Sequence, residues 1–214
     1  MNVRERIAMN AAQYFKPGDV INLGIGIPSL CGDYAPQGVM IHTENGLVGI
    51  GPLADGVLAV EGFSNATAMR FTPVPGASAF DSADSFGLVR SGKLAACVLG
   101  ALQVAENGDL ANWAQPGRVF GMGGAMDLVN GAKKVIIAME LTTKKGQPKI
   151  VKSCSFPLTG PKCVDHIVTE QCVIDVTPNG LELVAVLEGL TPEDIQQQVE
   201  PTLNVSSQLR TMAH

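Results

Sequence analysis

The run from Val135 to Leu141 constrains the fold of this 214-residue chain more than any other stretch. All of its residues except Glu140 are apolar, and no polar residues alternate with them. A strand that shows one face to water usually alternates apolar with polar residues, whereas a parallel strand is covered on both faces and reads as a continuous apolar run. The run therefore predicts a parallel strand in the interior of an α/β fold.

Short apolar strands and amphipathic helices alternate along the rest of the chain. Strands are predicted over Val20–Leu23, Val39–Thr43 and Leu94–Leu99, helices over Met1–Phe15, Pro28–Tyr34, Ser82–Arg90 and Ala125–Val129, a hairpin over Cys172–Val176 and Leu181–Leu187, and a last helix after an N-cap at Thr191. Residues 51–79 are expected to form loops with short strands. Because neither a repeat nor a linker divides the sequence, we predict one α/β domain over residues 1–214, with a mainly parallel sheet flanked by helices.

Charge and composition argue against several classes of partner. The formal net charge is −5 and no basic stripe is present, so nucleic acid is not an expected ligand. No apolar run reaches the ~18 residues that a membrane-spanning helix needs. The five cysteines contain no Cys-x-x-Cys pair, which favours buried free thiols over a zinc site. We therefore expect a cytoplasmic protein without a metal or a membrane partner.

Three segments are expected at the same edge of the sheet, because ligands of open α/β sheets bind beyond the carboxyl ends of the strands. Gly24–Pro28 and Gly121–Gly124 are glycine-rich loops, and Glu44–Gly46 presents a carboxylate on a tight turn. Backbone amides that face a fixed carboxylate can stabilise the oxyanion formed when that carboxylate attacks a carbonyl. The simpler interpretation stays open, since glycine pairs commonly form only turns and a glutamate in a turn is commonly a solvated surface group.

Other catalytic patterns fit less well. Neither glycine run continues as Gly-x-Gly-x-x-Gly, because Ser29 and Met126 occupy the third glycine position. The chain has no Gly-x-Ser-x-Gly elbow. Cys163 and His166 are close in sequence, but no third residue that would orient the histidine is evident. His42 is expected to be structural and not a general base.

At these residues the sequence resembles a known family. It is similar to the beta subunit of the two-subunit 3-oxoacid CoA-transferases, of the acetate/butyrate–acetoacetate type, over nearly its whole length. The segments that carry the resemblance are Asn22–Pro28, Thr43–Gly46, Phe80–Ala83, Leu110–Trp113, Gly121–Met139 and Pro157–Thr159. The catalytic glutamate of the family's Ser-Glu-Asn-Gly motif falls on Glu44, and Thr43 replaces the serine while keeping a hydroxyl.

The resemblance implies a CoA-transferase-like fold and a ping-pong reaction through a glutamyl-CoA thioester on Glu44. It implies no cofactor apart from the CoA thioester, which is a substrate. It also implies a CoA-transferase alpha subunit as partner, in an αβ or (αβ)2 heteromer that acts on acyl-CoA and carboxylic acids. The expected oxyanion and substrate-binding residues are, in order of preference, Gly24 and Gly26, then Gly123 and Gly124, with Asn45 and Gly46 beside the nucleophile.

The sequence departs from the family's pattern in one loop. Thr67 and Ala68 stand where relatives of the acetoacetate type have two glycines, and Lys93 replaces a histidine. We expect Thr67 to border the acyl pocket and to alter the choice of acid, with harmless drift as the alternative. Two other functions stay open at this point: a phosphosugar isomerase-like enzyme and a non-catalytic regulatory subunit on the same scaffold. An intact Glu44 within its motif favours the transferase.

Overall fold

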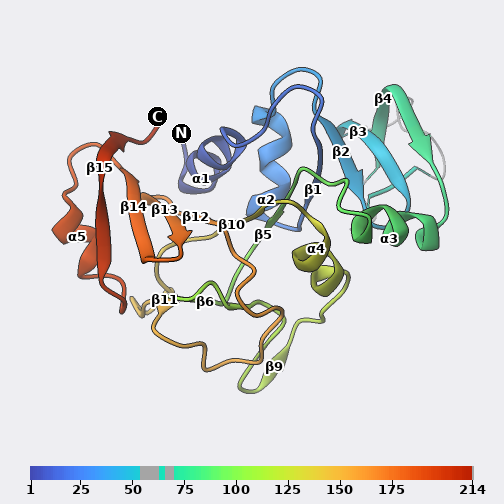
Figure 1. Cartoon of the computed structure of the whole chain (residues 1–214). Coiled ribbons are helices and arrows are strands. Elements are labelled where there is room, and N and C mark those ends of the chain that lie inside the picture. Colours follow the sequence, from blue (N-terminus) through green and yellow to red (C-terminus); the bar gives the residue numbers. More distant parts are fainter. Residues whose placement is uncertain (54–62, 66–69, 214) are drawn as a thin grey trace.

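A computed structural model describes residues 1–53, 63–65 and 70–213 (Figure 1). Its main element is a ten-stranded sheet with the order β15-β14-β13-β12-β10-β5-β1-β2-β3-β4. The five central strands are all parallel to one another; they are β2 (Met40–Thr43), β1 (Val20–Leu23), β5 (Ala96–Leu99), β10 (Val135–Ala138) and β12 (His166–Val168). This arrangement confirms the predicted α/β fold with a mainly parallel sheet.

Antiparallel strands extend the sheet on both sides. On one side, β3 (Leu47–Leu53) pairs with β2 and β4 (Phe71–Ala79). On the other, the predicted hairpin is present as β13 (Cys172–Thr177) and β14 (Gly180–Val186), and β15 (Leu203–Thr211) adds a parallel edge strand. The expectation of loops with only short strands over residues 51–79 was wrong for β4, because its pairing with β3 compensates for the prolines and glycine within it.

Helices cover both faces of the parallel strands. The helix α1 (Val3–Ala12), the short helix α2 (Ile27–Leu30) and the 3₁₀ turn η1 (Cys31–Tyr34) pack in one apolar cluster. The helices α3 (Ser82–Arg90), α4 (Ala125–Gly131) and α5 (Pro192–Gln196) lie on the other side, where α4 and α5 contribute most to the second cluster. The helix predicted over Pro28–Tyr34 is thus divided into α2 and η1.

The side chains of β10 explain the apolar run that predicted it. Ile136 and Ala138 belong to the cluster beneath α1, whereas Val135, Ile137 and Met139 belong to the opposite cluster. Successive residues of a strand point to opposite faces, so both faces of this strand must be apolar when both are covered. The regular strand ends at Ala138, earlier than the predicted Leu141, although Leu141 is also fully buried.

Two helix starts follow the predicted capping chemistry. The side chain of Asp81 accepts a hydrogen bond from the backbone N–H of Asp84, at 2.9 Å, before α3. Thr191 and Asp194 form a reciprocal capping box at the start of α5. An N-cap of this kind contributes about 1 kcal/mol by satisfying otherwise unpaired amide groups.

Smaller β elements lie beyond the main sheet. Short strands β6 (Gln103–Ala105), β7 (Leu110–Ala111) and β11 (Ile150–Val151) form a three-stranded sheet, and β8 (Ala114–Gln115) pairs with β9 (Arg118–Val119). The sequence pattern did not predict these two- and three-residue strands. Across the described parts of the chain, no helix combines the length and the apolar character needed to cross a membrane.

The direction in which the chain builds the sheet changes next to β1. After β1 the chain adds β2 on one side, and it later returns to add β5 and β10 on the other. The carboxyl ends of β1 and β5 therefore border a topological switch point, the place where open α/β sheets usually bind ligands. Glu44 directly follows β2 at the same edge of the sheet.

Candidate active site

Glu44 occupies a three-residue turn between β2 and β3. Thr43 pairs with Leu47 across the hairpin, and the N–H of Gly46 donates to the carbonyl of Thr43 at 3.0 Å. Gly46 has a φ of +112°, and a Cβ at this position would overlap the carbonyl oxygen of Phe80. Only glycine suits both the left-handed backbone and the close approach. The predicted tight turn is therefore present, and Gly46 shapes it.

Asn45 ties this turn to a neighbouring segment. Its side-chain amide donates to the carbonyl of Ser64 at 2.9 Å, and its side-chain oxygen accepts from the hydroxyl of Thr43 at 2.7 Å. Since the side chain of Asn45 uses its donor and its acceptor within the protein, it positions the turn that carries Glu44. The hydroxyl of Thr43, which a serine would also supply, has a defined role in the same network.

The Glu44 carboxylate lies against the glycine loop that precedes α4. The backbone N–H of Gly124 donates to this carboxylate. A Cβ at Gly123 would lie 3.7 Å from Oε1 of Glu44, and a Cβ at Gly124 would overlap Oε2. The same Cβ at Gly124 would also meet the ring of Phe86 at 2.9 Å. The structure thus brings together the turn of Glu44 and the second predicted glycine loop, and leaves no room there for a side chain.

The surroundings of Glu44 raise the pKa of its carboxyl group above the ordinary value. Partial burial is the main cause, the hydrogen bond from Gly124 lowers the pKa, and the negative charge of Asp127 raises it. Asp127 is itself paired with Arg90, with 2.7 Å between the carboxylate and Nε. A poorly solvated carboxylate with a raised pKa is more basic, and therefore a better nucleophile once it is ionised.

The first glycine loop differs from what we expected. The N–H of Gly24 donates to the carbonyl of Val98 at 2.8 Å and extends the pairing of β1 with β5. The choice of Gly24 as a leading oxyanion donor was therefore wrong, because its amide is already used inside the sheet. Gly26, with a φ of +90°, precedes the first residue of α2 and remains a candidate. The geometry favours Gly123 and Gly124, which were ranked second.

His42 is buried in the strand that leads to Glu44. Its Nδ1 accepts from the side-chain amide of Asn22 at 3.1 Å, and its Nε2 lies 2.9 Å from the hydroxyl of Ser85. Burial lowers the pKa of His42 to about 4. A neutral imidazole that joins β1, β2 and α3 fits the predicted structural role and does not face the carboxylate as a base.

The protonation of His42 predicts a pH dependence of stability. Its folded pKa of about 4 lies below the ordinary value of 6.5. The unfolded chain therefore binds a proton that the folded protein excludes, and stability falls by roughly 2–3 kcal/mol as the pH drops from above 6.5 to 4. Urea unfolding of the wild type and of His42→Gln at several pH values measures this contribution. The variant should lose the corresponding part of the slope, and identical slopes for both proteins would contradict the assignment.

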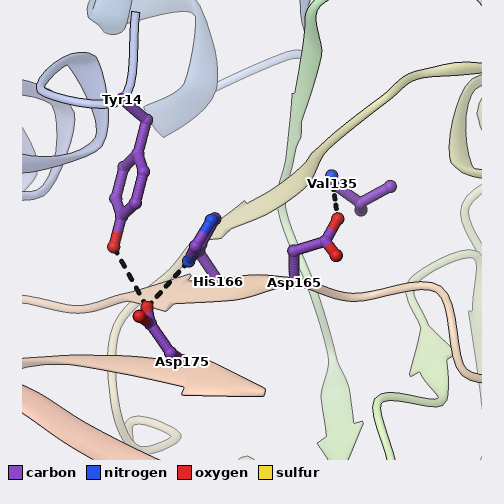
Figure 2. A network of polar contacts seen from close by, with 5 residues as sticks. All are labelled: Tyr14, Val135, Asp165, His166 and Asp175. Carbon is purple, nitrogen blue, oxygen red and sulfur yellow. Dashed lines mark hydrogen bonds and ion pairs between the residues drawn. The ribbon is translucent and has the colours of Figure 1, made fainter. Parts of the chain in front are cut away.

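A second histidine lies at the opposite edge of the parallel strands. Figure 2 shows His166 and Tyr14 converging on Asp175, at 2.7 Å and 3.2 Å, with the two rings stacked at 4.1 Å between centroids. Asp175 is the orienting residue that sequence reasoning did not find. Cys163 takes no part in this network, because its thiol donates to the carbonyl of Gly160. The network joins the end of α1 to β12 and β13, so it does not supply a cysteine nucleophile.

Other expectations concern metals, thiols and the acyl pocket. All five cysteines are free, and Cys31, Cys97 and Cys172 are buried. Within residues 1–53, 63–65 and 70–213, no three His, Cys, Asp or Glu side chains are placed to hold a metal ion. Thr67 and Ala68 lie outside the described residues. Phe86 and Asp127 were not predicted; the former follows the apolar spacing of α3, but its contact with the glycine loop depends on tertiary packing.

A pocket of about 420 Å³ opens at the switch point of the sheet. Residues that follow three parallel strands line it: Ile25 and Pro28 after β1, Gly100 and Leu102 after β5, and Met139 and Glu140 after β10. Lys149 and Phe156 complete part of its wall. The edge of the sheet that carries Glu44 thus also offers a space large enough for part of a substrate.

Known proteins resemble this chain in sequence over nearly its whole length. The sequence model of the family described as Coenzyme A transferase matches residues 4–198. The beta-type chain of a probable succinyl-CoA:3-ketoacid coenzyme A transferase of Bacillus subtilis is 44% identical over 206 residues, 95% of each chain. The corresponding chain of the 3-oxoadipate CoA-transferase of Acinetobacter baylyi is also 44% identical, over 204 residues and 94% of each chain.

Among solved structures, the acyl-CoA transferase apoenzyme of Escherichia coli O157:H7 has a similar fold. The TM-score is 0.80 at 20% sequence identity, with 99% of the present chain covered. The match covers only 43% of the Escherichia coli chain, so the present chain spans less than half the length of that protein. At this level of identity the likeness concerns the fold alone.

Proposed function

The chain belongs to the coenzyme A transferase family, and on that premise we propose that Glu44 is the nucleophile that carries CoA between an acyl-CoA and a short-chain carboxylic acid. Its homologues are CoA-transferase subunits, and the chain is an enzyme of that class. The observation that carries the proposal is the position of the Glu44 carboxylate, held on a glycine turn against the amide of Gly124. Neither the isomerase nor the regulatory alternative accounts for this contact.

The proposed reaction proceeds in two displacements at carbonyl carbons. A carboxylate oxygen of Glu44 attacks the thioester carbon, the carbon–sulfur bond breaks, and CoA leaves as a thiolate while an acyl–glutamyl anhydride forms. The thiolate then attacks the glutamyl carbonyl, which releases the first acid as a carboxylate and leaves CoA on Glu44 as a thioester. The second acid reverses these steps. Electrons balance throughout, and no proton has to be transferred.

The residues around Glu44 support this chemistry. Each displacement develops an oxyanion, and preorganised backbone amides are the donors best suited to stabilise it. The amides of Gly123 and Gly124 lie on the loop beside the carboxylate, and Gly26 lies on the neighbouring loop. His42 is buried, neutral and hydrogen-bonded to Asn22 and Ser85, so it is not needed as a base. Partial burial of Glu44 favours attack on an acyl group over exchange with water.

A second, alpha subunit completes the proposed enzyme. Each of the two bacterial relatives is named as one lettered subunit of its transferase, which implies a partner chain, and the Escherichia coli acyl-CoA transferase has more than twice the length that matches this chain. Ile25, Val119 and Phe120 are large apolar side chains that are 74%, 71% and 47% exposed in the loops around the site. We assign these side chains to contact with the alpha subunit in an αβ or (αβ)2 heteromer. The five free thiols support a reducing compartment such as the cytoplasm.

The acid substrates belong to the short-chain 3-oxoacids or related acids. The two relatives described above have equal identity to this chain but differ in the acid they are named for, so identity alone does not select one. The loop with Thr67 and Ala68 remains our candidate for a specificity element. Exchanging both residues for glycine should change the ratio of kcat/KM between acetoacetate and bulkier acids by roughly 10-fold, the usual effect of a few atoms in a pocket. Unchanged ratios would show that the substitution is neutral.

Initial-rate kinetics of the co-expressed heteromer test the proposed function. A covalent enzyme intermediate forms before the second acid reacts, so double-reciprocal plots at several concentrations of the second substrate should be parallel. Intersecting lines would show that both substrates must be bound together and would remove the glutamyl-CoA intermediate. Absence of transfer with every short-chain acyl-CoA and acid, in an assembled complex, would favour a regulatory or isomerase function instead.

A further inference from the structure

Lys149 is the unassigned cation of the pocket at the switch point. It lies beside Leu141, to whose carbonyl its backbone N–H donates at 3.4 Å, and it immediately precedes β11. Its side chain lines the pocket together with Lys144 and Glu140. Among the described residues, the ammonium group of Lys149 has neither a hydrogen-bond nor an ion-pair partner within 4 Å. A half-buried cation without a partner is costly unless a ligand supplies the opposite charge.

The electrostatics of the pocket agree with this interpretation. Burial lowers the pKa of Lys149 to about 8, whereas the charges of Glu140 and Glu170 raise it without forming a close ion pair. Glu170 is occupied elsewhere, because its carboxylate accepts hydrogen bonds from the backbone of Leu141 and from the side chain of Gln171. An anion that enters the pocket would therefore find an ammonium group that is not neutralised by contact with either carboxylate.

The order of the strands sets how far this cation is from the nucleophile. Glu44 follows β2, whereas Lys149 lies beside the extension of β10, and β1 and β5 stand between these strands. Three strand spacings correspond to about 14 Å. A short-chain acid attached to Glu44 cannot extend across three strands, but the pantetheine arm of CoA, attached by its sulfur at the same carboxyl group, has the length to do so. The apolar wall of Ile25, Leu102 and Met139 suits such an arm.

We propose that Lys149 binds a phosphate group of CoA and that the pocket between Glu44 and Lys149 holds the pantetheine arm. This inference rests on the proposed function, because it takes Glu44 as the point to which CoA is attached. It makes Lys149 a residue that binds CoA in both half-reactions and leaves the choice of acid unaffected. The other anion available in the reaction is the distal carboxylate of a dicarboxylic acid, which the experiment below separates from phosphate.

The test compares Lys149→Met with the wild type in the co-expressed heteromer. Methionine keeps much of the length of the side chain and removes the charge. The KM for acyl-CoA should rise by about 10- to 100-fold, the usual effect of losing one charge-assisted hydrogen bond. The KM for the matching acyl-pantetheine, which has no nucleotide phosphates, should be unchanged, as should the KM for the acid. Lys149→Arg should recover most of the affinity, and Lys145→Met, an exposed lysine outside the pocket wall, is the control.

Each alternative result has a distinct meaning. An equal rise for acyl-CoA and acyl-pantetheine would overturn the phosphate contact, and a rise confined to the KM of the acid would assign Lys149 to a substrate carboxylate. Loss of the heteromer on size-exclusion chromatography would place Lys149 in the contact between the two chains instead. Failure of the wild type to form an adduct on Glu44 would reject the proposed function itself. A Lys149→Met variant that still forms this adduct at high acyl-CoA separates the two questions.

Discussion

Replacing Glu44 by glutamine should abolish CoA transfer while leaving the protein folded and assembled. Glutamine keeps an oxygen that can accept the hydrogen bond from Gly124, so the turn between β2 and β3 should retain its shape. It cannot act as the carboxylate nucleophile. Loss of an essential nucleophile lowers kcat on the order of 10⁴-fold or more. Steady-state transfer rates with matched thermal unfolding curves measure both parts of this expectation.

A control is available in another glutamate. Glu106 is exposed and follows β6, away from the turn of Glu44, and its replacement by glutamine should leave the transfer rate within about twofold of the wild type. Residual transfer by Glu44→Gln above about one per cent of the wild type, in a preparation free of wild-type protein, would show that another residue or a direct reaction between substrates carries CoA.

Replacing Gly124 by alanine is expected to have the second largest effect. The added Cβ would overlap Oε2 of Glu44 and press against the ring of Phe86. Either the carboxylate or the loop must move, and the amide that faces the developing oxyanion moves with it. Removing one oxyanion donor typically lowers kcat by about 10²- to 10³-fold. Steady-state kinetics should show this loss mainly in kcat, because the pocket lined by Ile25 and Lys149 is unchanged.

Gly87 provides the matched control for this substitution. It lies in α3 next to Phe86, and a Cβ there would meet nothing within 4 Å. Alanine in the interior of a helix is favoured over glycine by roughly 0.5–1 kcal/mol, so Gly87→Ala should keep its activity and unfold at the same or a slightly higher temperature. Equal activity of Gly124→Ala and Gly87→Ala would show that the approach of Gly124 to Glu44 does not matter for catalysis.

The parts of the fold that sequence predicted are those with a local physical signature. The apolar run that begins at Val135 revealed a strand covered on both faces, and two separate apolar clusters receive its alternate side chains. Asp81 and Thr191 identified helix starts because capping depends on residues only three positions apart. Glu44 and Gly46 likewise predicted their turn, since a three-residue hairpin loop needs glycine at its last position.

The parts that sequence missed depend on partners distant in the chain. The strand β15 is largely exposed and has no regular alternation; it is defined by its parallel pairing with β14. Gly24 looked like a free loop donor until its pairing with Val98 was known. Phe86 and Asp127 influence Glu44 only because α3 and α4 pack beside the turn. Local patterns identify the nucleophile, whereas the order of its amide donors is a tertiary property.

The most direct test of the account is the intact mass of this chain after incubation of the co-expressed heteromer with an acyl-CoA and no acceptor acid. The account predicts an increase equal to the mass of CoA less one water, mapped to Glu44, removed by borohydride and absent from Glu44→Gln. An unmodified chain, in a heteromer that is intact and active in transfer, would contradict the glutamyl-CoA intermediate.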